Sequence, residues 1–552
     1  METSSKVFVR SENAAVDASK LESEGFDVLR GRVREDGFEM IVSPAEYLLL
    51  VGRGYELEIL DKGRPLREIQ ADRSLGLDLV PTGYPDYVTV VSQMTDFAAA
   101  YPSICRLYDL TDYYGLPATY EGNHIYALKI SDNVGTDEDE PSFLMVSCHH
   151  AREIVTPVIA LYSIEQLLTG YGSDPGITAL VDNNEIWISC VWNPDGYEYV
   201  FEVDNWWRKN RQPYSLYYGV DLNRNYAFGW DSYCSGSSYP YSETYKGPSP
   251  ASEVETRTME VFHNDRNFAK MIDYHSYGRE LLYEYCCHDH PFVSYLYSEA
   301  VLIATQAGYQ GNVRTPSAEG ENYEWQLATN GTYAFLMETH SEFQPPYELA
   351  QAEAANVWPS AVWMLEREIP ISGHVTDYAT GQPLAADINI VGVTFPNGEY
   401  FRSDETFGRY HLFVPAGTYD IEFSKTGYET QVHNVTVTSG NGEVLDVALL
   451  PPNEPPGAPL IVGPEEGLPE IEYTFTFESS DPDGDDVYYF VDWGDGDTAD
   501  WVGPYTCGEP VALRHTWLTP GSRYIRAKAR DTHYQESDFS EHRIRVPRKK
   551  RT

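Results

Sequence analysis

The sequence predicts a large α/β domain with a mixed, mostly parallel sheet and helices on both faces. It also predicts a small N-terminal α/β domain and two C-terminal antiparallel β-sandwich domains. Short apolar strands alternate with helical stretches over residues 84–368, turn-rich β patterns begin at residue 369, and a proline-rich linker interrupts them at 451–456. A chain of 552 residues is too long for one ordinary core, so several domains are expected.

The N-terminal segment, residues 1–80, has the pattern of a small α/β unit. Ser43 is a good helix N-cap residue, and glycines follow the apolar stretch that it begins. The expected order is a strand at 6–11, a helix at 16–25, a strand at 37–42, a helix at 43–54 and a strand at 55–60. We interpret this unit as a pro-segment-like or accessory domain.

The large domain, residues 84–368, alternates apolar strands with helical stretches. Its expected strands are 124–130, 142–148, 185–191, 269–275 and 332–339, and its clearest helices are 157–168 and 252–263. Alternation of this kind predicts a mostly parallel sheet covered by helices.

Beyond the large domain the pattern is purely β. Turn signals such as Pro396-Asn397-Gly398 and Pro415-Ala416-Gly417 predict an antiparallel sandwich over residues 369–450. The linker Pro451-Pro452-Asn453-Glu454-Pro455-Pro456 follows. Residues 457–552 predict a second sandwich with a basic tail.

Charge and hydropathy exclude several classes of partner. The chain holds 85 acidic and 39 basic residues, a net charge of −46, so nucleic acid is an unsuitable partner. Solubility is the simplest interpretation of this charge, and a salt-adapted or calcium-rich setting is the alternative. No apolar run approaches the ~20 residues of a membrane-spanning helix, so no transmembrane segment is expected.

The seven cysteines include no CxxC pair, so a zinc knuckle is not supported. Their odd number leaves at least one thiol unpaired, and they do not settle the redox compartment. The start of the chain has no apolar leader region. The protein is therefore either intracellular or an exported protein whose signal peptide is absent from this sequence.

The stretch His149-His150-Ala151-Arg152-Glu153 follows an expected strand. His150 and Glu153, three positions apart at a strand's carboxyl end, can converge on one metal ion. Catalytic zinc usually has three protein ligands and an open fourth position. His275 ends another expected strand, and open α/β sheets place their sites at such ends. These three residues are the predicted metal ligands.

Other polar residues supply the chemistry that a metal site needs. Glu338 lies near the end of an apolar strand, where a carboxylate needs a partner or a role, and it is a candidate base for a metal-bound water. A site that recognises a carboxylate needs fixed cations. Arg224 beside Asn223, Arg208 and Arg152 are the candidates.

Six motifs occur in a fixed order over most of residues 84–345. They are HARE at 150–153, NPDGYEY at 193–199, WWRKNR at 206–211, GVDLNRN at 219–225, SETYKGPSPASEVETR at 242–257 and HSYG at 275–278. In sequence and order they resemble the zinc carboxypeptidase family, peptidase family M14, of pancreatic carboxypeptidases A and B.

The resemblance implies a role for each matching residue. His150, Glu153 and His275 would bind one Zn²⁺, and Glu338 would be the general base that activates the zinc-bound water. Arg208 would stabilise the oxyanion and Arg152 would line the outer subsites. Asn223 and Arg224 would clamp the terminal carboxylate of a peptide or protein substrate with a free C-terminus.

The sequence departs from the family pattern near its specificity pocket. The mobile tyrosine of the family aligns with Pro316, and Tyr309 and Tyr323 fit that role only with a shift. Tyr323 aligns with the bottom of the pocket and would shorten it. Three flanking acids make a basic terminal side chain possible, although solvent exposure is the simpler expectation for them: Glu319, Glu321 and Glu324. Pancreatic members carry a disulfide near the active-site loop. Cys234 is the only cysteine in the corresponding segment, so no matching pair is expected here.

The appended segments resemble known modules. Residues 371–450, with Gly408-Arg409-Tyr410 and Gly427-Tyr428, resemble the carboxypeptidase regulatory-like, transthyretin-like sandwich. Residues 457–547 resemble a PKD-like immunoglobulin-type domain, with acidic runs at 481–486 and 492–497. These acids suit Ca²⁺, but dense Asp-Gly is also ordinary turn chemistry. Such modules are typical of secreted enzymes.

The sequence therefore predicts a secreted zinc metallocarboxypeptidase, a hydrolase that removes the C-terminal residue of peptides, and we expect a monomer. Two alternatives remain open. One is a related peptidase acting on cell-wall or modified peptides, which the Asn223-Arg224 clamp disfavours. The other is a catalytically inactive peptide-binding homologue, which the intact metal ligands, Glu338 and Arg208 disfavour.

Overall fold

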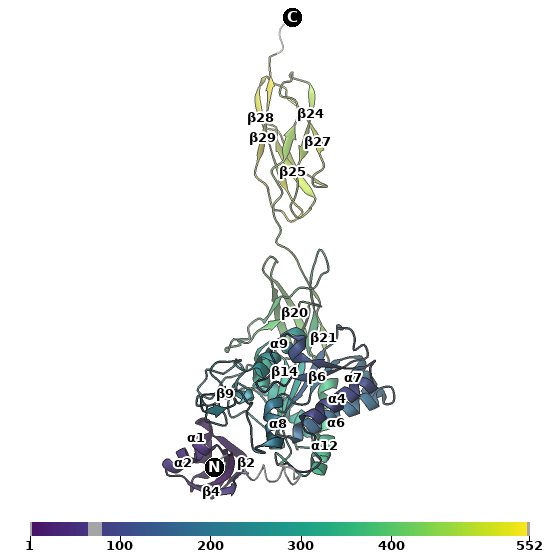
Figure 1. Cartoon of the computed structure of the whole chain (residues 1–552). Coiled ribbons are helices and arrows are strands. Elements are labelled where there is room, and N and C mark those ends of the chain that lie inside the picture. Colours follow the sequence, from purple (N-terminus) through teal and green to yellow (C-terminus); the bar gives the residue numbers. More distant parts are fainter. Residues whose placement is uncertain (1–2, 64–79, 549–552) are drawn as a thin grey trace. The chain divides into compact units, whose positions relative to one another are not determined.

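The computed structural model describes residues 3–63 and 80–548 (Figure 1). The end of the predicted N-terminal domain, residues 64–79, and the last four residues of the basic tail lie outside the described residues. The chain forms two compact units, one of residues 1–425 with 430–449 and one of residues 426–429 with 450–552.

An eight-stranded mixed sheet is the centre of the first unit. Its middle strands pair in parallel, and antiparallel pairs join β12 to β14, β8 to β6 and β6 to β5. In spatial order the strands are β13 (Val313–Arg314), β12 (Glu280–Leu282), β14 (Tyr333–Thr339), β11 (Lys270–Ser276), β7 (Ser142–Ser147), β8 (Glu185–Ser189), β6 (Tyr126–Ile130) and β5 (Cys105–Asp109). The mixed, mostly parallel sheet expected from the sequence is therefore present.

The middle strands are uninterrupted runs of buried residues, because helices and loops cover the sheet. Helix α6 contacts α4, α7 and α12 as well as strands β7 and β11, and these helices gather together in Figure 1. Helix α11 contacts β11 and β14. The helices are α4 (Tyr87–Ala100), α5 (Leu110–Tyr113), α6 (Val155–Gly170), α7 (Pro175–Asp182), α8 (Pro194–Glu202), α9 (Val254–Arg266), α10 (Val293–Gln306), α11 (Asn322–Ala328) and α12 (Tyr347–Glu366).

The N-terminal segment is a four-stranded antiparallel sheet with two helices. The strand order is β2 (Asp27–Arg34), β3 (Gly37–Val42), β1 (Ser5–Arg10) and β4 (Glu56–Asp61), with α1 (Ala14–Ser23) and α2 (Pro44–Gly52). Ser43 caps α2 as expected, since its hydroxyl accepts from the Glu46 amide at 3.2 Å and the Glu46 carboxylate accepts from the Ser43 amide at 2.9 Å. Strand β2 was not predicted, because basic residues at alternate positions weaken the apolar pattern by which a strand is recognised in the sequence.

A β-sandwich completes the first unit. One sheet holds β18 (Arg409–Leu412), β15 (Ile371–Asp377), β21 (Glu443–Val444) and β22 (Val447–Leu449), and the other holds β17 (Phe401–Arg402), β16 (Asp387–Ile390), β19 (Gly417–Ser424) and β20 (Gln431–Val437). Phe413 of this sandwich stacks on Tyr333 of β14 with ring centroids 4.7 Å apart. The contact couples the sandwich to a strand that carries part of the candidate site.

The second unit is a separate β-sandwich with its own aromatic core. Its sheets are β23 (Leu460–Val462), β24 (Glu472–Glu478) and β27 (Val511–Thr516), and β26 (Thr498–Tyr505), β25 (Val487–Asp492), β28 (Gly521–Arg530) and β29 (Ser540–Val546). Asp481 accepts hydrogen bonds from the amides of Asp483 and Asp485, which is the turn chemistry that the sequence left as an alternative to Ca²⁺. Calcium binding stays a prediction.

Among the described residues, no helix combines the length and apolar character needed to cross a membrane.

Candidate active site

A turn between β7 and α6 positions the first two predicted metal ligands. Cys148 adopts a left-handed conformation (φ 61°), which turns the chain at the end of β7. The Ala151 amide donates to the Arg208 carbonyl at 2.9 Å and the Glu153 amide donates to the His150 carbonyl at 3.1 Å. These bonds hold the turn, so His150 and Glu153 project toward the same point from its two ends.

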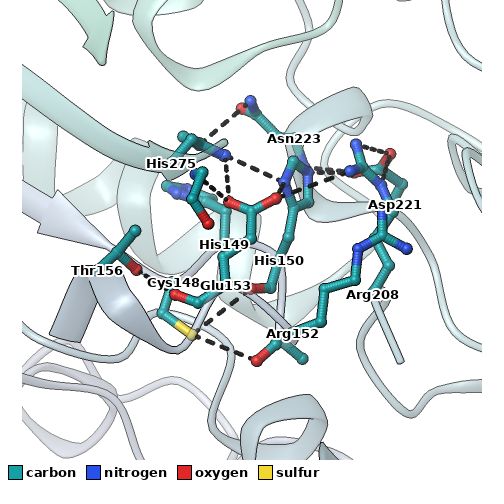
Figure 2. Close-up of polar contacts among 12 residues, drawn as sticks. Cys148, His149, His150, Arg152, Glu153, Thr156, Arg208, Asp221, Asn223 and His275 are labelled. Atoms are coloured by element: carbon teal, nitrogen blue, oxygen red, sulfur yellow. Dashed lines mark hydrogen bonds and ion pairs between the residues drawn. The ribbon is translucent and has the colours of Figure 1, made fainter. Parts of the chain in front are cut away.

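The three predicted ligands converge in Figure 2. Glu153 Oε1 lies 2.8 Å from His150 Nδ1, and Glu153 Oε2 lies 3.1 Å from His275 Nδ1. The two Nδ1 atoms are 3.0 Å apart. All three side chains are buried. Two imidazole nitrogens and a carboxylate at these separations form the donor set of a catalytic zinc site, and side chains without an ion would rarely be packed so closely.

Two buried aspartates orient the histidine ligands through their outer nitrogens. Asp221 Oδ1 lies 3.1 Å from His150 Nε2, and Asp273 Oδ1 lies 3.2 Å from His275 Nε2. His149 is 3.1 Å from Asp273. Carboxylates behind metal-bound histidines fix the tautomer that leaves Nδ1 free for the metal. Sequence reasoning missed both aspartates, although Asp273 shares a face of β11 with His275.

The surrounding charges put Glu153 and His150 in the forms that bind a metal. At His275, burial is outweighed by Asp273 and Glu153, which raise the pKa, so a cation would have to displace the proton of this imidazole. Burial opposes the charge of Glu153, but His150 and His275 hold the pKa of this carboxyl below its usual range. Burial and the nearby Arg208 guanidinium lower the pKa of His150. A charged carboxylate and a neutral imidazole are the forms that bind a metal.

Glu338 stands opposite His275 in the parallel register of β14 and β11. Its Oε2 atom is buried and has no hydrogen-bond partner within the part of the chain that the structure describes. Burial, and then the charge of Glu153, raises the pKa of this carboxyl to about 7. A carboxylate with a free oxygen beside the ligand set has the position and proton affinity of a general base.

Arg208 approaches the ligands from the segment that follows α8. Its guanidinium donates to Asp221 Oδ2 from Nε at 3.0 Å, and Nη2 lies 2.9 Å from the same oxygen. Nη1 is 3.9 Å from Glu153 Oε1. Burial opposes this charge, but Asp221, Asp27 and Glu153 raise the pKa of Arg208, so the guanidinium stays charged. A fixed cation therefore faces the ligand set.

Asn223 and Arg224 lie on a 3-10 turn, η1 (Leu222–Arg224), that Asp221 caps through the Asn223 amide at 3.1 Å. Asn223 Nδ2 is 3.5 Å from His275 Nε2. Arg224 Nη1 donates to Glu321 Oε1 at 2.8 Å. Both residues line the same cavity as the metal ligands. The two residues predicted to clamp a carboxylate therefore line one cavity, and Arg224 is paired with an internal carboxylate.

The N-terminal domain closes one side of this cavity. Arg152 is fully buried and pairs through Nη2 with Asp27 of β2. Phe26, Asp27, Val28 and Leu29 line the cavity together with the metal ligands. Leu29 and Ile41 also form a buried apolar cluster with Phe343 of the large domain. Arg152 therefore faces the cavity as predicted, but a carboxylate of the same chain engages it.

The residues expected at the specificity pocket are buried. Tyr323 is fully buried and its hydroxyl donates to the Glu284 carbonyl at 2.8 Å, and its place at the bottom of the pocket stays a prediction. The three flanking acids are buried rather than exposed. Glu319 accepts from the Cys287 amide at 2.7 Å, and Glu324 accepts from the Glu321 amide at 3.2 Å. Glu324 lies on α11 and the other two acids precede this helix, and their burial was missed because the whole chain is rich in acids that are ordinarily exposed.

Cys234 is not unpaired, because it forms a disulfide with Cys287 across 53 positions of sequence. No local pattern indicates this bond, because the two cysteines are far apart in sequence and meet only in the folded chain. The bond anchors the loop that contains Cys287, whose amide donates to Glu319. Cys286 beside it remains a free thiol.

The mixed α/β fold and this donor set describe a protein built to hold a catalytic metal. The family model described as zinc carboxypeptidase matches residues 90–377, more than half of the chain, and the model described as carboxypeptidase regulatory-like domain matches residues 370–450. The chain therefore belongs to the zinc carboxypeptidase family, which confirms the resemblance.

Some curated relatives are named carboxypeptidases, and others are named inactive metallocarboxypeptidases. A zinc carboxypeptidase of Saccharothrix mutabilis subsp. capreolus is 38% identical over 27% of this chain and 33% of its own length. Carboxypeptidase A1 of Rattus norvegicus is 31% identical over 54% of this chain and 74% of its own. An inactive metallocarboxypeptidase of Talaromyces stipitatus is 28% identical over 48% of this chain and 49% of its own. The chain thus spans about a third of the first of these relatives.

The first unit of the chain resembles a solved carboxypeptidase in fold. The carboxypeptidase A of Helicoverpa armigera matches with a TM-score of 0.53 and 21% identity, over 65% of this chain and 96% of that one. A PKD domain of an M14-like peptidase from a Thermoplasmatales archaeon is 41% identical over 17% of this chain and 99% of that one, with a TM-score of 0.17.

Asp273→Asn should lower zinc affinity about 10- to 100-fold, because His275 loses the carboxylate that orients it. The measurement is a competition titration of zinc against a chromogenic chelator. Asp182→Asn, on the exposed end of α7, is the control and should bind zinc normally. Equal affinity of Asp273→Asn and the unchanged protein would refute the orienting role.

Proposed function

We propose that this chain is a zinc-dependent metallocarboxypeptidase that hydrolyses the C-terminal peptide bond of peptides and proteins. The observation that carries the proposal is the convergence of His150, Glu153 and His275 on one point beside the unpartnered Glu338. The family membership and the carboxylate clamp support the same reaction.

His150 Nδ1, His275 Nδ1 and the Glu153 carboxylate would hold the zinc ion. When bound there, the ion would polarise the substrate carbonyl and make a water molecule acidic enough to attack it. Asp221 and Asp273 keep the two imidazoles oriented for this task. The donor set fits zinc, because nitrogen and carboxylate ligands leave a fourth position open.

Glu338 takes the proton of the attacking water on Oε2 and then passes it to the nitrogen of the departing residue. Burial raises the pKa of this carboxyl, which gives it a higher proton affinity than an exposed glutamate has. Arg208 donates to the oxyanion of the tetrahedral intermediate. Its bonds to Asp221 hold the guanidinium in place before the reaction begins.

Asn223 and Arg224 bind the free carboxylate that distinguishes a chain terminus from an internal peptide bond. A guanidinium and an amide recognise a carboxylate in two places at once. This clamp lies in the same cavity as Glu338, so a bound terminus presents its last peptide bond to the base. The second candidate function is a peptidase for cell-wall or modified peptides. Such an enzyme has less need of a clamp for a free terminal carboxylate.

The contacts of residues 3–63 favour a pro-segment over an accessory module. This domain supplies Phe26 to Leu29 as one wall of the cavity and engages Arg152 with Asp27. A peptide cannot occupy the outer part of the cavity while these residues fill it. We propose that the domain inhibits the enzyme until it is displaced.

We also propose that the protein is exported. The Cys234–Cys287 disulfide supports this, because disulfides persist in oxidising compartments. The appended sandwich domains are compatible with an extracellular enzyme.

Release of single amino acids from peptides with free or amidated C-termini tests the proposal. We expect release only from free termini and loss of release after treatment with a zinc chelator, restored by zinc. Equal cleavage of amidated peptides would contradict an exopeptidase. Zinc binding without any release, before and after limited proteolysis, would identify an inactive binding protein.

Glu338→Gln should keep one zinc per chain but lower kcat about 10²- to 10⁴-fold, because the amide cannot accept the proton of the attacking water. Zinc content and steady-state kinetics measure the two effects. Glu342→Gln, an exposed neighbour, is the matched control and should leave kcat unchanged. Near-normal turnover of Glu338→Gln would refute its role as the base.

Docking of the N-terminal domain should weaken as pH rises through about 7. Three buried acids meet at its contact with the large domain, where Ser4 bonds Asp204 and Glu243, and the Glu243 amide donates to Glu46 at 3.4 Å. Burial raises the pKa of Glu46 and of Asp204 to about 7. Lys209 is the nearby cation, and burial lowers its pKa.

The docked state therefore binds more protons between about pH 4.5 and 7 than the separated state, so acid pH favours docking. Hydrogen–deuterium exchange of β2, corrected for the intrinsic pH effect, should become faster as pH rises from about 4.5 to about 7 and should then level off. Glu46→Gln with Asp204→Asn should reduce this pH dependence, whereas Glu56→Gln on the exposed β4 should not. Slower exchange at high pH would contradict the prediction.

A further inference from the structure

The carboxylate clamp contains an internal carboxylate that the proposed reaction does not use. Glu321, which directly precedes α11, lines the cavity beside the metal ligands and is 4% exposed. Its Oε1 accepts from Arg224 Nη1 at 2.8 Å. Its Oε2 is buried without a partner among the described residues. A buried carboxylate oxygen without a partner, on a residue that lines a binding cavity, indicates a ligand with a donor.

The neighbouring cations are already committed. Arg314 also lines this cavity, but its Nε donates to Glu280 at 2.7 Å, so this pair is neutral. Arg224 and Glu321 form a second neutral pair. Arg208 is held by Asp221. None of these three cations is left to balance an added negative charge near Glu321.

A bound peptide terminus would upset this balance. Its carboxylate must share Arg224 with Glu321, so two buried carboxylates would face one guanidinium. An uncompensated buried charge is strongly unfavourable, whereas a complete set of pairs is tolerated. A cation on the substrate's terminal side chain, directed at Glu321 Oε2, would restore neutrality.

We infer that Glu321 determines specificity, and that the enzyme prefers peptides whose C-terminal residue is lysine or arginine. This inference rests on the proposed function. Leu282 and Leu336 line the same cavity and can cover the methylene stem of such a side chain while its charged end reaches Glu321. A terminal leucine would leave the surplus charge in place, and a terminal glutamate would add to it.

The test compares peptides that differ only in their last residue: lysine, arginine, leucine, glutamine or glutamate. The zinc-loaded full chain is used intact and after limited proteolysis. We expect kcat/KM for lysine and arginine to exceed that for leucine by at least about 100-fold, with glutamate the poorest. Equal rates, or a preference for leucine or glutamate, would overturn the inference.

Glu321→Gln keeps the size of the side chain but removes its charge. The ratio of kcat/KM for lysine to that for leucine should fall at least about tenfold, because leucine becomes a better substrate and lysine a poorer one. Glu348→Gln, exposed at the start of α12, is the control and should keep the original ratio. An unchanged ratio in folded, zinc-loaded Glu321→Gln would refute the role of Glu321.

The inference about Glu321 can be wrong while the proposed carboxypeptidase function is right. Release of terminal residues with no preference for lysine or arginine contradicts only the role of Glu321. No release from any free terminus contradicts the carboxypeptidase itself. If Glu321→Gln does not fold, the substrate series on the unchanged chain still decides.

Discussion

The parallel pairing of β11 with β7 on one side and β14 on the other is the constraint on which the site depends. Parallel strands bring their carboxyl ends to the same edge of the sheet, so residues distant in sequence meet there. The register sets His275 opposite Glu338, and the turn after β7 adds His150 and Glu153. A shift of one residue in either pairing would turn the ligand or the base to the opposite face. The apolar runs that bury these strands therefore also position the chemistry.

Buried charge is the second organising feature. Most charged groups around the cavity have a partner: Asp221 joins Arg208 and His150, and Asp273 joins His149 and His275. Paired burial keeps each group in one orientation, because breaking any pair would expose a charge to an apolar surrounding. A buried carboxylate oxygen that has no hydrogen-bond partner in such a setting indicates a binding or catalytic role. Glu338 and Glu321 each have such an oxygen among the described residues, and both residues line the cavity.

The sequence could predict the elements and residues that depend on local patterns. The apolar runs located the five central strands within two residues at either end, and the strand-end positions of His150, His275 and Glu338 indicated the metal site. Contacts across long separations could not be predicted. Asp27 meets Arg152, and Cys234 meets Cys287, only after domains and loops pack together. The burial of Glu319 was missed because acids are ordinarily exposed and this chain is rich in them.

The arginines expected to bind substrate are paired with carboxylates of the protein itself. Asp27 engages Arg152 and Glu321 engages Arg224, so neither cation is buried alone before a substrate arrives. Substrate binding is then an exchange of ion pairs, and its net free energy is the small difference between the old pairs and the new ones. In an exchange, affinity depends on whether every displaced group finds a new partner. Removal of the N-terminal domain would withdraw Asp27 from the cavity, whereas Glu321 would remain. Under the two proposals, the same arrangement of paired arginines would serve inhibition at Arg152 and selection of the terminal residue at Arg224.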